Sequence, residues 1–387
     1  MNSLINGRDR NHTNPIFNDN KMKLGVFGFN ASNGCAITMA PERHIPDWDR
    51  DLKMAQAADR MGFEALVPLG RWRGFDGDTN FNGICFETAT WAAGLGASTK
   101  VPSIMATQHV PTVHPIVAAK QAVTVDQISG GRYGINIVCG WFTPEMEMFG
   151  GKMMEHDTRY DYAQEWIDVV KMLWTKEDYF DFEGRFFNIK KGFASPKPVQ
   201  QPFPPLMNAG GSPKGMDFAA RNCDMVYLLL DPVDIDKARA QIARYKDLAR
   251  ERYNREIQVW SYVYVVQRDT QKEAEDYLHY YAVEHGDDIA TGNILRVLGV
   301  ETGIWSPEQA EQFKFHFKAG WGGYPVIGTP EKIVETLQML SDIGLDGASL
   351  TWVDYTDGIA RWEKDVMPLL QQSGLRKAFT PATPPPG

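Results

Sequence analysis

The short run NAGGSP at residues 208–213 has the residue types that hold a small anion. Gly210 and Gly211 let backbone N–H groups approach a ligand closely. Ser212 adds a hydroxyl directly before a predicted helix, whose N-terminus attracts negative charge. A phosphate is the anion that suits this arrangement. The alternative interpretation is that these residues form only a turn and the N-cap of the helix.

Arg159 and Tyr160 stand at the start of another predicted helix and could extend the same anion site. A guanidinium would add a charge-assisted contact, and the tyrosine would add a stacking ring. The alternative is a surface arginine beside a tyrosine that faces the core. Ahead of this pair, the run NIVCGWFTPE at residues 136–145 combines the amide of Asn136, a flexible glycine, two aromatic rings and the acid Glu145.

Arg71 and Arg73 follow an earlier predicted strand and place two guanidiniums near one site, unless they are a solvated surface pair. Two such groups suit an anionic or strongly polar substrate, such as a sulfonate, sulfone or carboxylate. The many aromatic residues suit a planar ring instead, so the substrate class stays open. His109 and His114 are candidates for proton transfer or substrate hydrogen bonding, with structural histidines as the alternative.

Composition and missing motifs exclude several classes of protein. The 387 residues are 43% hydrophobic and 23% charged, which is typical of a globular chain. The net charge of −9 argues against nucleic acid or a membrane surface as the main partner. Without a signal peptide or a long apolar run, we expect a cytoplasmic protein. The sequence has no H-x-x-E-H, G-x-S-x-G or phosphate-loop motif and no paired cysteines, which disfavours hydrolytic and metal-based chemistry.

Strand-like and helix-like segments alternate along the chain, as in βα units around a parallel sheet. The predicted strands are residues 23–27, 63–69, 101–105, 134–138, 205–208, 224–230, 259–266 and 347–352, and the predicted helices are residues 47–61, 85–95, 115–128, 158–174, 214–222, 233–252 and 330–343. Eight such strands predict an α/β fold of the (β/α)8 TIM-barrel type. In that fold the reacting groups lie at the C-terminal ends of the strands.

The chain is longer than the roughly 250 residues of a typical barrel, which predicts insertions. One is a hairpin at residues 179–189, with its turn at Glu183 and Gly184. The larger one spans about residues 279–328 after the seventh strand, where it would form a lid over the barrel mouth, with Arg296 as a charge facing the substrate. We expect one barrel domain over residues 23–379, between poorly ordered tails at residues 1–22 and 380–387.

Three motifs occur in order along the chain: DQISGGRYGINIVCGWFTPE at residues 126–145, HDTRY at residues 156–160 and NAGGS at residues 208–212. Together they resemble the bacterial luciferase-like, flavin-dependent monooxygenases. The similarity covers roughly residues 23–370. It is closest to the pyrimidine (uracil) monooxygenases and the dimethyl sulfone monooxygenases, with the alkanesulfonate monooxygenases further off. The combination is far more specific than any one of its parts.

This resemblance implies that the cofactor is FMN, used as FMNH2 that a separate flavin reductase supplies. Carried over position by position, it assigns flavin binding to Gly70, Arg71, Asn136, Glu145, Arg159, Tyr160 and Ser212. Gly210 and Gly211 belong to the same phosphate-binding turn. Ala106 and Thr107 correspond to the stretch where relatives hold O2 and the flavin peroxide.

The implied reaction forms a flavin peroxide from FMNH2 and O2 in a site that excludes water, and then oxygenates a small organic substrate with cleavage of a C–S or amide-type C–N bond. Thr107, His109 and Trp141 are the residues we expect to form hydrogen bonds in the pocket and to wall it. The family's habit suggests a homodimer or homotetramer. Two alternatives stay open: a deazaflavin (F420)-dependent hydride-transfer enzyme of the same fold, and a non-catalytic flavin-binding protein.

Overall fold

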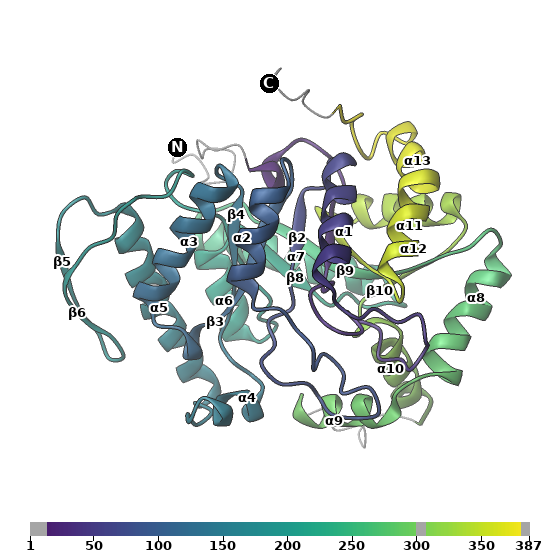
Figure 1. Cartoon of the computed structure of the whole chain (residues 1–387), viewed down its shortest axis with the longest axis horizontal. Coiled ribbons are helices and arrows are strands. Elements are labelled where there is room, and N and C mark those ends of the chain that lie inside the picture. Colours follow the sequence, from purple (N-terminus) through teal and green to yellow (C-terminus); the bar gives the residue numbers. More distant parts are fainter. Residues whose placement is uncertain (1–13, 299–306, 381–387) are drawn as a thin grey trace.

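The computed structural model describes residues 14–298 and 307–380. Its central sheet is a closed parallel barrel, because each of eight strands pairs with the next and the last pairs with the first (Figure 1). The strands are β1 (Lys23–Phe27), β2 (Ala65–Val67), β3 (Ser103–His109), β4 (Tyr133–Val138), β7 (Leu206–Asn208), β8 (Met225–Leu228), β9 (Gln258–Gln267) and β11 (Gly347–Thr351). The predicted (β/α)8 barrel is confirmed.

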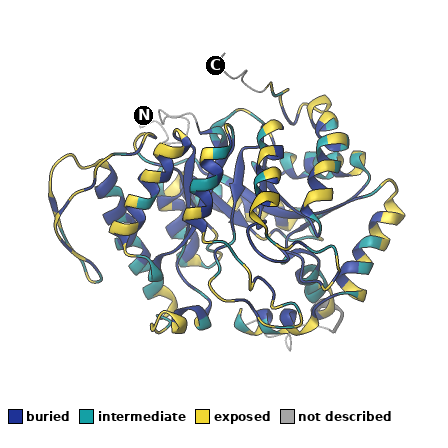
Figure 2. Ribbon diagram, in the orientation of Figure 1, coloured by how far each residue is buried: buried dark blue, intermediate teal, exposed yellow. Residues whose placement is uncertain are grey.

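Helices surround the barrel, with buried faces toward the sheet and exposed faces outward (Figure 2). They are α1 (Trp48–Arg60), α2 (Thr88–Ser98), α3 (Pro115–Ser129), α5 (His156–Thr175), α6 (Pro213–Asn222), α7 (Ile235–Tyr253) and α11 (Pro330–Asp342). The sequence did not predict the short helices α4 (Thr143–Met148), α12 (Tyr355–Arg361) and α13 (Met367–Gln372). Within the described ranges, the helices are all too short or too polar to span a bilayer.

Alternate residues of each strand pack either inside the barrel or in the core between the barrel and the helices, because successive side chains of a strand point to opposite faces. In β9, Trp260 and Tyr262 pack with Phe27 inside the barrel. Val259 and Val263, which flank this pair along the strand, pack in the larger core under the helices. This alternation decides which residues near the strand ends can reach the mouth of the barrel.

The two predicted insertions are present. β5 (Phe180–Glu183) and β6 (Asn188–Gly192) pair as an antiparallel hairpin that stands out from one side of the barrel (Figure 1). After β9 the chain forms α8 (Gln271–His279), a π-helical turn (Tyr280–Glu284), α9 (Asp288–Val297), α10 (Pro307–Gly320) and β10 (Tyr324–Gly328). Strand β10 was not expected; it pairs with the second half of β9.

The larger insertion covers the C-terminal ends of the barrel strands. α9 and α10 lie at the same end of the molecule as α4, far from α13 (Figure 1). Asp287, the N-cap of α9, connects this insertion to the loop after β2. Its Oδ2 accepts hydrogen bonds from the N–H of Thr79 at 2.9 Å and from the Thr79 hydroxyl at 2.8 Å. The N–H of Ile37, in the loop after β1, donates to the carbonyl of Lys318 at 2.9 Å. Arg296 is exposed and donates to Asn293 of its own helix.

The expectation of a poorly ordered tail over residues 1–22 is wrong for residues 14–22. Ile16 and Met22 are fully buried. The amide of Asn14 donates to Ser103 Oγ at 3.1 Å and to Gln200 Oε1 at 3.0 Å. The polar composition that suggested disorder therefore supplies hydrogen bonds to the N-terminal end of the barrel. Residues 1–13 and 381–387 lie outside the described residues.

Candidate active site

The N-terminus of α6 forms the base of the predicted anion site. Ser212 is its N-cap, and its Oγ accepts the N–H of Gly215 at 3.1 Å. Gly210 donates its N–H to Asn208 Oδ1 at 2.8 Å, which fixes the turn before the helix. A side chain at Gly211 would meet only open space. The end of the helix, with its positive dipole, is therefore accessible to a ligand.

Tyr160, from α5, lies against this turn. A Cβ at Gly210 would lie 2.8 Å from the Tyr160 hydroxyl, and one at Gly215 would lie 2.5 Å from it. Both positions therefore need glycine if the ring is to reach the turn. The hydroxyl also interacts with Ser212, and burial raises the pKa of Tyr160. The structure thus brings together three of the residues that the sequence assigned to one site.

Arg159 connects this turn with the loop after β4. Its Nη1 donates to the carbonyl of Gly140. Its Nε is buried and has no hydrogen-bond partner in the protein. Leaving a buried donor unpaired costs free energy. A ligand that accepts a hydrogen bond from Arg159 Nε would remove that cost. A solvated surface arginine has no such cost, because water accepts its hydrogen bonds.

Thr107 and Asn136 form a hydrogen-bonded pair at the ends of β3 and β4. Asn136 Nδ2 donates to Thr107 Oγ1 at 3.2 Å, and Thr107 donates to the carbonyl of Pro68 at 2.7 Å. Each side chain is buried, with 8% of its residue surface exposed. Asn136 Oδ1 has no partner in the protein. The pair therefore presents one unused acceptor at the mouth of the barrel.

A buried ion pair joins the loops after β2 and β4. Arg71 Nη1 lies 3.3 Å from Glu145 Oε1, and both side chains are almost completely buried. The same carboxylate oxygen accepts the backbone N–H of Trp72 at 2.7 Å. The Arg71 guanidinium carbon also lies 4.6 Å from the ring centre of Phe75. Glu145 thus holds the β2 loop in place and compensates the charge of Arg71.

The backbone N–H of Arg73 also donates to Glu145 Oε1, at 3.4 Å, but the Arg73 side chain takes no part in this arrangement. About half of its side chain is exposed, and its guanidinium lies 3.5 Å from Asp76 Oδ2. The expectation that two guanidiniums converge at the mouth is therefore wrong, because the chain after β2 turns Arg73 outward while Arg71 points inward. Of these two arginines only Arg71 faces the mouth, and it already has a carboxylate partner.

A cavity of about 410 Å³ opens between the loops after β2 and β3. Gly70, Arg71, Thr107 and His109 line its inner part. Gly70 allows the two loops to touch, since a Cβ there would lie 2.8 Å from Thr107 Cγ2. Burial and the nearby charge of Arg71 lower the pKa of His109 to about 3. His109 is therefore a neutral imidazole at pH 7, with one donor and one acceptor nitrogen.

Three further predicted residues have different positions. Trp141 lies on the other side of Arg71, with its ring centre 5.2 Å from the guanidinium carbon. His114 caps α3 and accepts the N–H of Ile116 at 3.3 Å, while its ring also lines the cavity. Ala106 packs in the core beneath the helices, so only its backbone is available to a ligand at the mouth.

Two aromatic residues at the mouth were missed by the sequence analysis. Trp321 follows α10 and has φ of 55°, a left-handed conformation that is uncommon for a residue other than glycine. The Tyr262 hydroxyl donates to the Trp321 carbonyl at 2.6 Å, and the Trp321 ring stacks on Phe81 at 5.5 Å. The alternation of Trp260 and Tyr262 along the predicted seventh strand is the signal that could have placed Tyr262 inside the barrel. Nothing in the sequence placed Trp321 above it.

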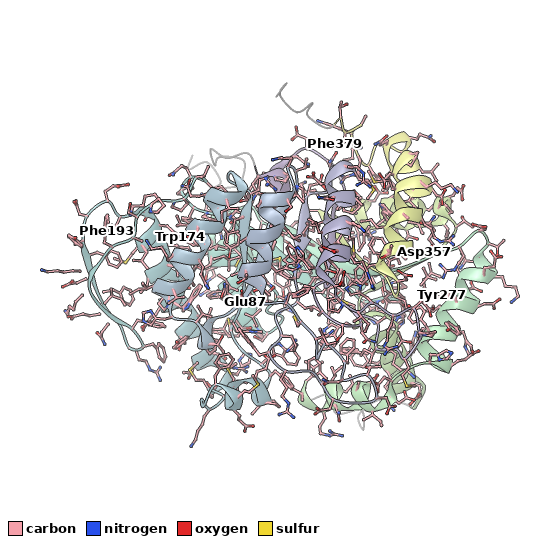
Figure 3. The ribbon with its side chains drawn as sticks, in the orientation of Figure 1. Glu87, Trp174, Phe193, Tyr277, Asp357 and Phe379 are labelled. Carbon is pink, nitrogen blue, oxygen red and sulfur yellow. The ribbon has the colours of Figure 1, made fainter. Side chains whose placement is uncertain are left out.

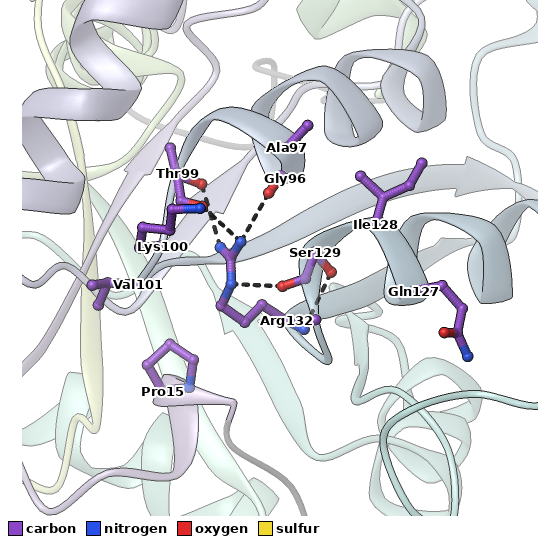
Figure 4. A pocket seen from close by; sticks show the side chains of 11 residues that line it. Pro15, Gly96, Ala97, Thr99, Lys100, Val101, Gln127, Ile128, Ser129 and Arg132 are labelled. Atoms are coloured by element: carbon purple, nitrogen blue, oxygen red, sulfur yellow. Dashed lines mark hydrogen bonds between the residues drawn. The ribbon is translucent and has the colours of Figure 1, made fainter. Parts of the chain in front are cut away.

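A second cavity, of about 500 Å³, lies at the opposite end of the barrel (Figure 4). Arg132 occupies its wall and donates to the carbonyls of Gly96 at 2.9 Å and Thr99 at 2.8 Å, at the end of α2. It also donates from Nε to the carbonyl of Ser129, at the end of α3. Because these bonds satisfy carbonyls at helix ends, Arg132 has a structural role.

Comparisons with known proteins identify the family of this chain. The family model described as luciferase-like monooxygenase matches residues 22–347. The chain belongs to this family. It is 30% identical over 361 residues to the FMNH2-dependent dimethylsulfone monooxygenase of Pseudomonas putida, a match that covers 91% of this chain and 96% of that protein. It is 27% identical over 371 residues to the pyrimidine monooxygenase RutA of Acinetobacter baylyi, covering 94% and 99%.

Solved structures share the fold of this luciferase-like monooxygenase. The long-chain alkane monooxygenase LadA superposes with a TM-score of 0.81 at 20% identity and covers 94% of each chain. The protein DmoA from Hyphomicrobium sulfonivorans superposes with a TM-score of 0.81 at 18% identity, covering 93% of this chain and 90% of that one. Both likenesses extend over the barrel and its insertions.

Proposed function

We propose that the protein is a two-component monooxygenase that uses FMNH2 and O2 to oxygenate a small organic substrate, with cleavage of a C–S or amide-type C–N bond. The two curated relatives support this proposal by their names, and family membership supports the monooxygenase chemistry. The observation that carries it is a pair of unused polar atoms at the mouth, Arg159 Nε from α5 and Asn136 Oδ1 from β4. Both belong to residues that the sequence assigned to the flavin.

The residues at the mouth fit FMN. The N-terminus of α6, Ser212 and Arg159 offer donors and positive charge to a phosphate, and Gly211 leaves room for it. Asn136 Oδ1 offers a buried acceptor to a ring N–H. Together these groups suit a molecule with an anionic end and a polar planar end.

Bound reduced FMN would supply the two electrons that activate O2. The chain's own residues exclude water and hold the reactants in place. Arg71, Phe75 and Trp141 close one side of the mouth with a guanidinium stacked among rings. His109 is neutral at pH 7, so it positions a polar group through its ring nitrogens and does not act as a cationic acid. Thr107 keeps its hydroxyl oriented through Pro68.

The test supplies reduced FMN by two routes. We expect oxygenated product and O2 consumption when a flavin reductase, FMN and NADH are present, or when chemically reduced FMN is added directly. We expect no turnover when NADH is added without a flavin reductase, because none of the residues assigned to the site is proposed to bind NADH. Full turnover with NADH alone contradicts the two-component proposal. Product formation without O2 consumption favours the deazaflavin-type hydride transfer.

We also propose that the protein is a homo-oligomer that associates through α3. Ile116, Val117 and Ile128 of this helix are 41%, 50% and 46% exposed. Burying such a row on a second copy would remove apolar surface from water. Val117→Asp should shift the mass measured by light scattering toward the monomer, whereas Ala243→Asp on the exposed face of α7 should not. An unchanged mass for Val117→Asp contradicts this interface. The cytoplasmic location stays a prediction from the sequence.

A further inference from the structure

The cavity beside Arg71 continues beyond the predicted flavin site. Its outer part is lined by Glu87, the N-cap of α2, and by Gln121 in the second turn of α3 (Glu87 is labelled in Figure 3). It shares no lining residue with the cradle of Arg159, Tyr160 and Ser212. A small molecule held there would lie next to Gly70 and Arg71, the pair expected to contact the flavin. The cavity is therefore placed to hold the substrate.

The charges around this cavity do not favour an anion. Arg71 is its single arginine, and Glu145 lies 3.3 Å from the guanidinium. An anionic substrate would compete with a buried carboxylate that the N–H of Trp72 also holds. At the rim, Glu87 adds a second carboxylate, which caps α2 by accepting the N–H of Thr90 at 2.7 Å. Burying an additional negative charge without its own counter-charge is unfavourable, because the charge loses its hydration.

Two polar atoms of residues that line the cavity are buried without a hydrogen-bond partner in the described part of the protein, Gln121 Oε1 and Arg71 Nε, and Glu145 already compensates the charge of Arg71. His109 contributes a neutral imidazole, because burial lowers its pKa to about 3. A neutral imidazole and an amide together present both donors and acceptors. These groups complement a neutral polar molecule of modest size.

We propose that the outer cavity selects an uncharged substrate that forms hydrogen bonds, such as an amide or a sulfone, and that the Arg71–Glu145 pair excludes anions of the same shape. This proposal rests on the proposed function, since it places the substrate beside FMN. It narrows the substrate class by rejecting sulfonates and carboxylates.

Two probe pairs that match in shape and differ in charge test the proposal. They are dimethyl sulfone against methanesulfonate, and acetamide against acetate. Binding to the FMN-loaded protein would be measured by saturation-transfer difference NMR, which needs no turnover. In at least one pair we expect the neutral probe to bind tenfold or more tightly than its anion, a difference of about 1.4 kcal/mol. The pair that shows this preference distinguishes amide from sulfone recognition.

Two variants locate the effect. Glu145→Gln should raise the affinity for the anionic probes at least tenfold, because it leaves Arg71 without its counter-charge, while Glu147→Gln on the exposed face of the same helix should not. Gln121→Leu should lower the affinity for the preferred neutral probe about tenfold, while Gln127→Leu on the same helix should not. Gln121→Leu keeps the test decisive if Glu145→Gln fails to fold.

Three results would overturn the proposal: anions that bind as tightly as their neutral partners, no binding of either neutral probe, or no effect of Gln121→Leu. FMN affinity is measured in parallel on the same samples. If FMN binds and the probes behave in one of these ways, the cavity assignment alone fails. If FMN itself does not bind, the proposed function fails first.

Discussion

Removing the Ser212 hydroxyl should weaken the binding of FMN without weakening the binding of riboflavin, which lacks the phosphate. Ser212 stands at the N-terminus of α6, beside the open space at Gly211 where an anion would lie. A second variant, Arg159→Ala, removes the guanidinium whose Nε is buried without a partner. Both changes act on the end of the ligand that carries the charge.

The magnitude follows from the type of bond that is lost. A hydrogen bond to a charged group contributes about 1.5–3 kcal/mol, so each variant should raise the Kd of FMN by about 10-fold to 150-fold. Ser212→Ala also removes the acceptor of the Gly215 N–H, which costs about 1 kcal/mol of folding stability. That loss is common to both ligands and cancels when FMN is compared with riboflavin.

The assay is titration of each variant with FMN and with riboflavin, followed by quenching of flavin fluorescence. Lys214→Met is the matched control, because Lys214 lies on the same helix turn but is exposed and paired with Asp161 at 2.8 Å. Its effect on FMN should stay below about 0.5 kcal/mol, as for other exposed charges. If Ser212→Ala and Arg159→Ala weaken both ligands by the same factor, or neither ligand, the phosphate assignment is wrong.

Two further predictions concern stability. Asp51 is fully buried, and burial raises its pKa from 3.8 to about 8. Because unfolding lets this carboxyl ionise, the free energy of unfolding falls as pH rises from about 4 to 8. Asp51→Asn should therefore stabilise the protein by about 4 kcal/mol at pH 7 and by little near pH 4, measured by urea unfolding at both values; an equal gain at both would contradict the argument. Arg132→Met should destabilise the protein by about 3 kcal/mol, because it leaves buried carbonyls of α2 and α3 unpaired. It should leave FMN affinity unchanged, and a loss of flavin binding equal to that of Arg159→Ala would show that Arg132 acts on the site.

The sequence determined the barrel and the composition of the proposed phosphate site. Alternating strand-like and helix-like segments predict a parallel sheet, and the count of eight strands favours a closed barrel. The run NAGGSP leads into a helix whichever way its neighbours pack, so Ser212 as an N-cap was readable from local chemistry. The apolar run around Asn136 predicts a strand from local pattern in the same way, and Asn136 lies in β4.

Only the tertiary structure decided which side chains are free to act. Arg71 and Arg73 are two residues apart and look equivalent in sequence, yet one is buried against Glu145 and the other is paired with Asp76 in solvent. Likewise, Trp321 reaches the mouth only because α10 ends above Tyr262. Such partners are far apart along the chain, and their charge balance depends on burial, which local patterns do not encode. The choice between a neutral and an anionic substrate therefore belongs to the folded protein.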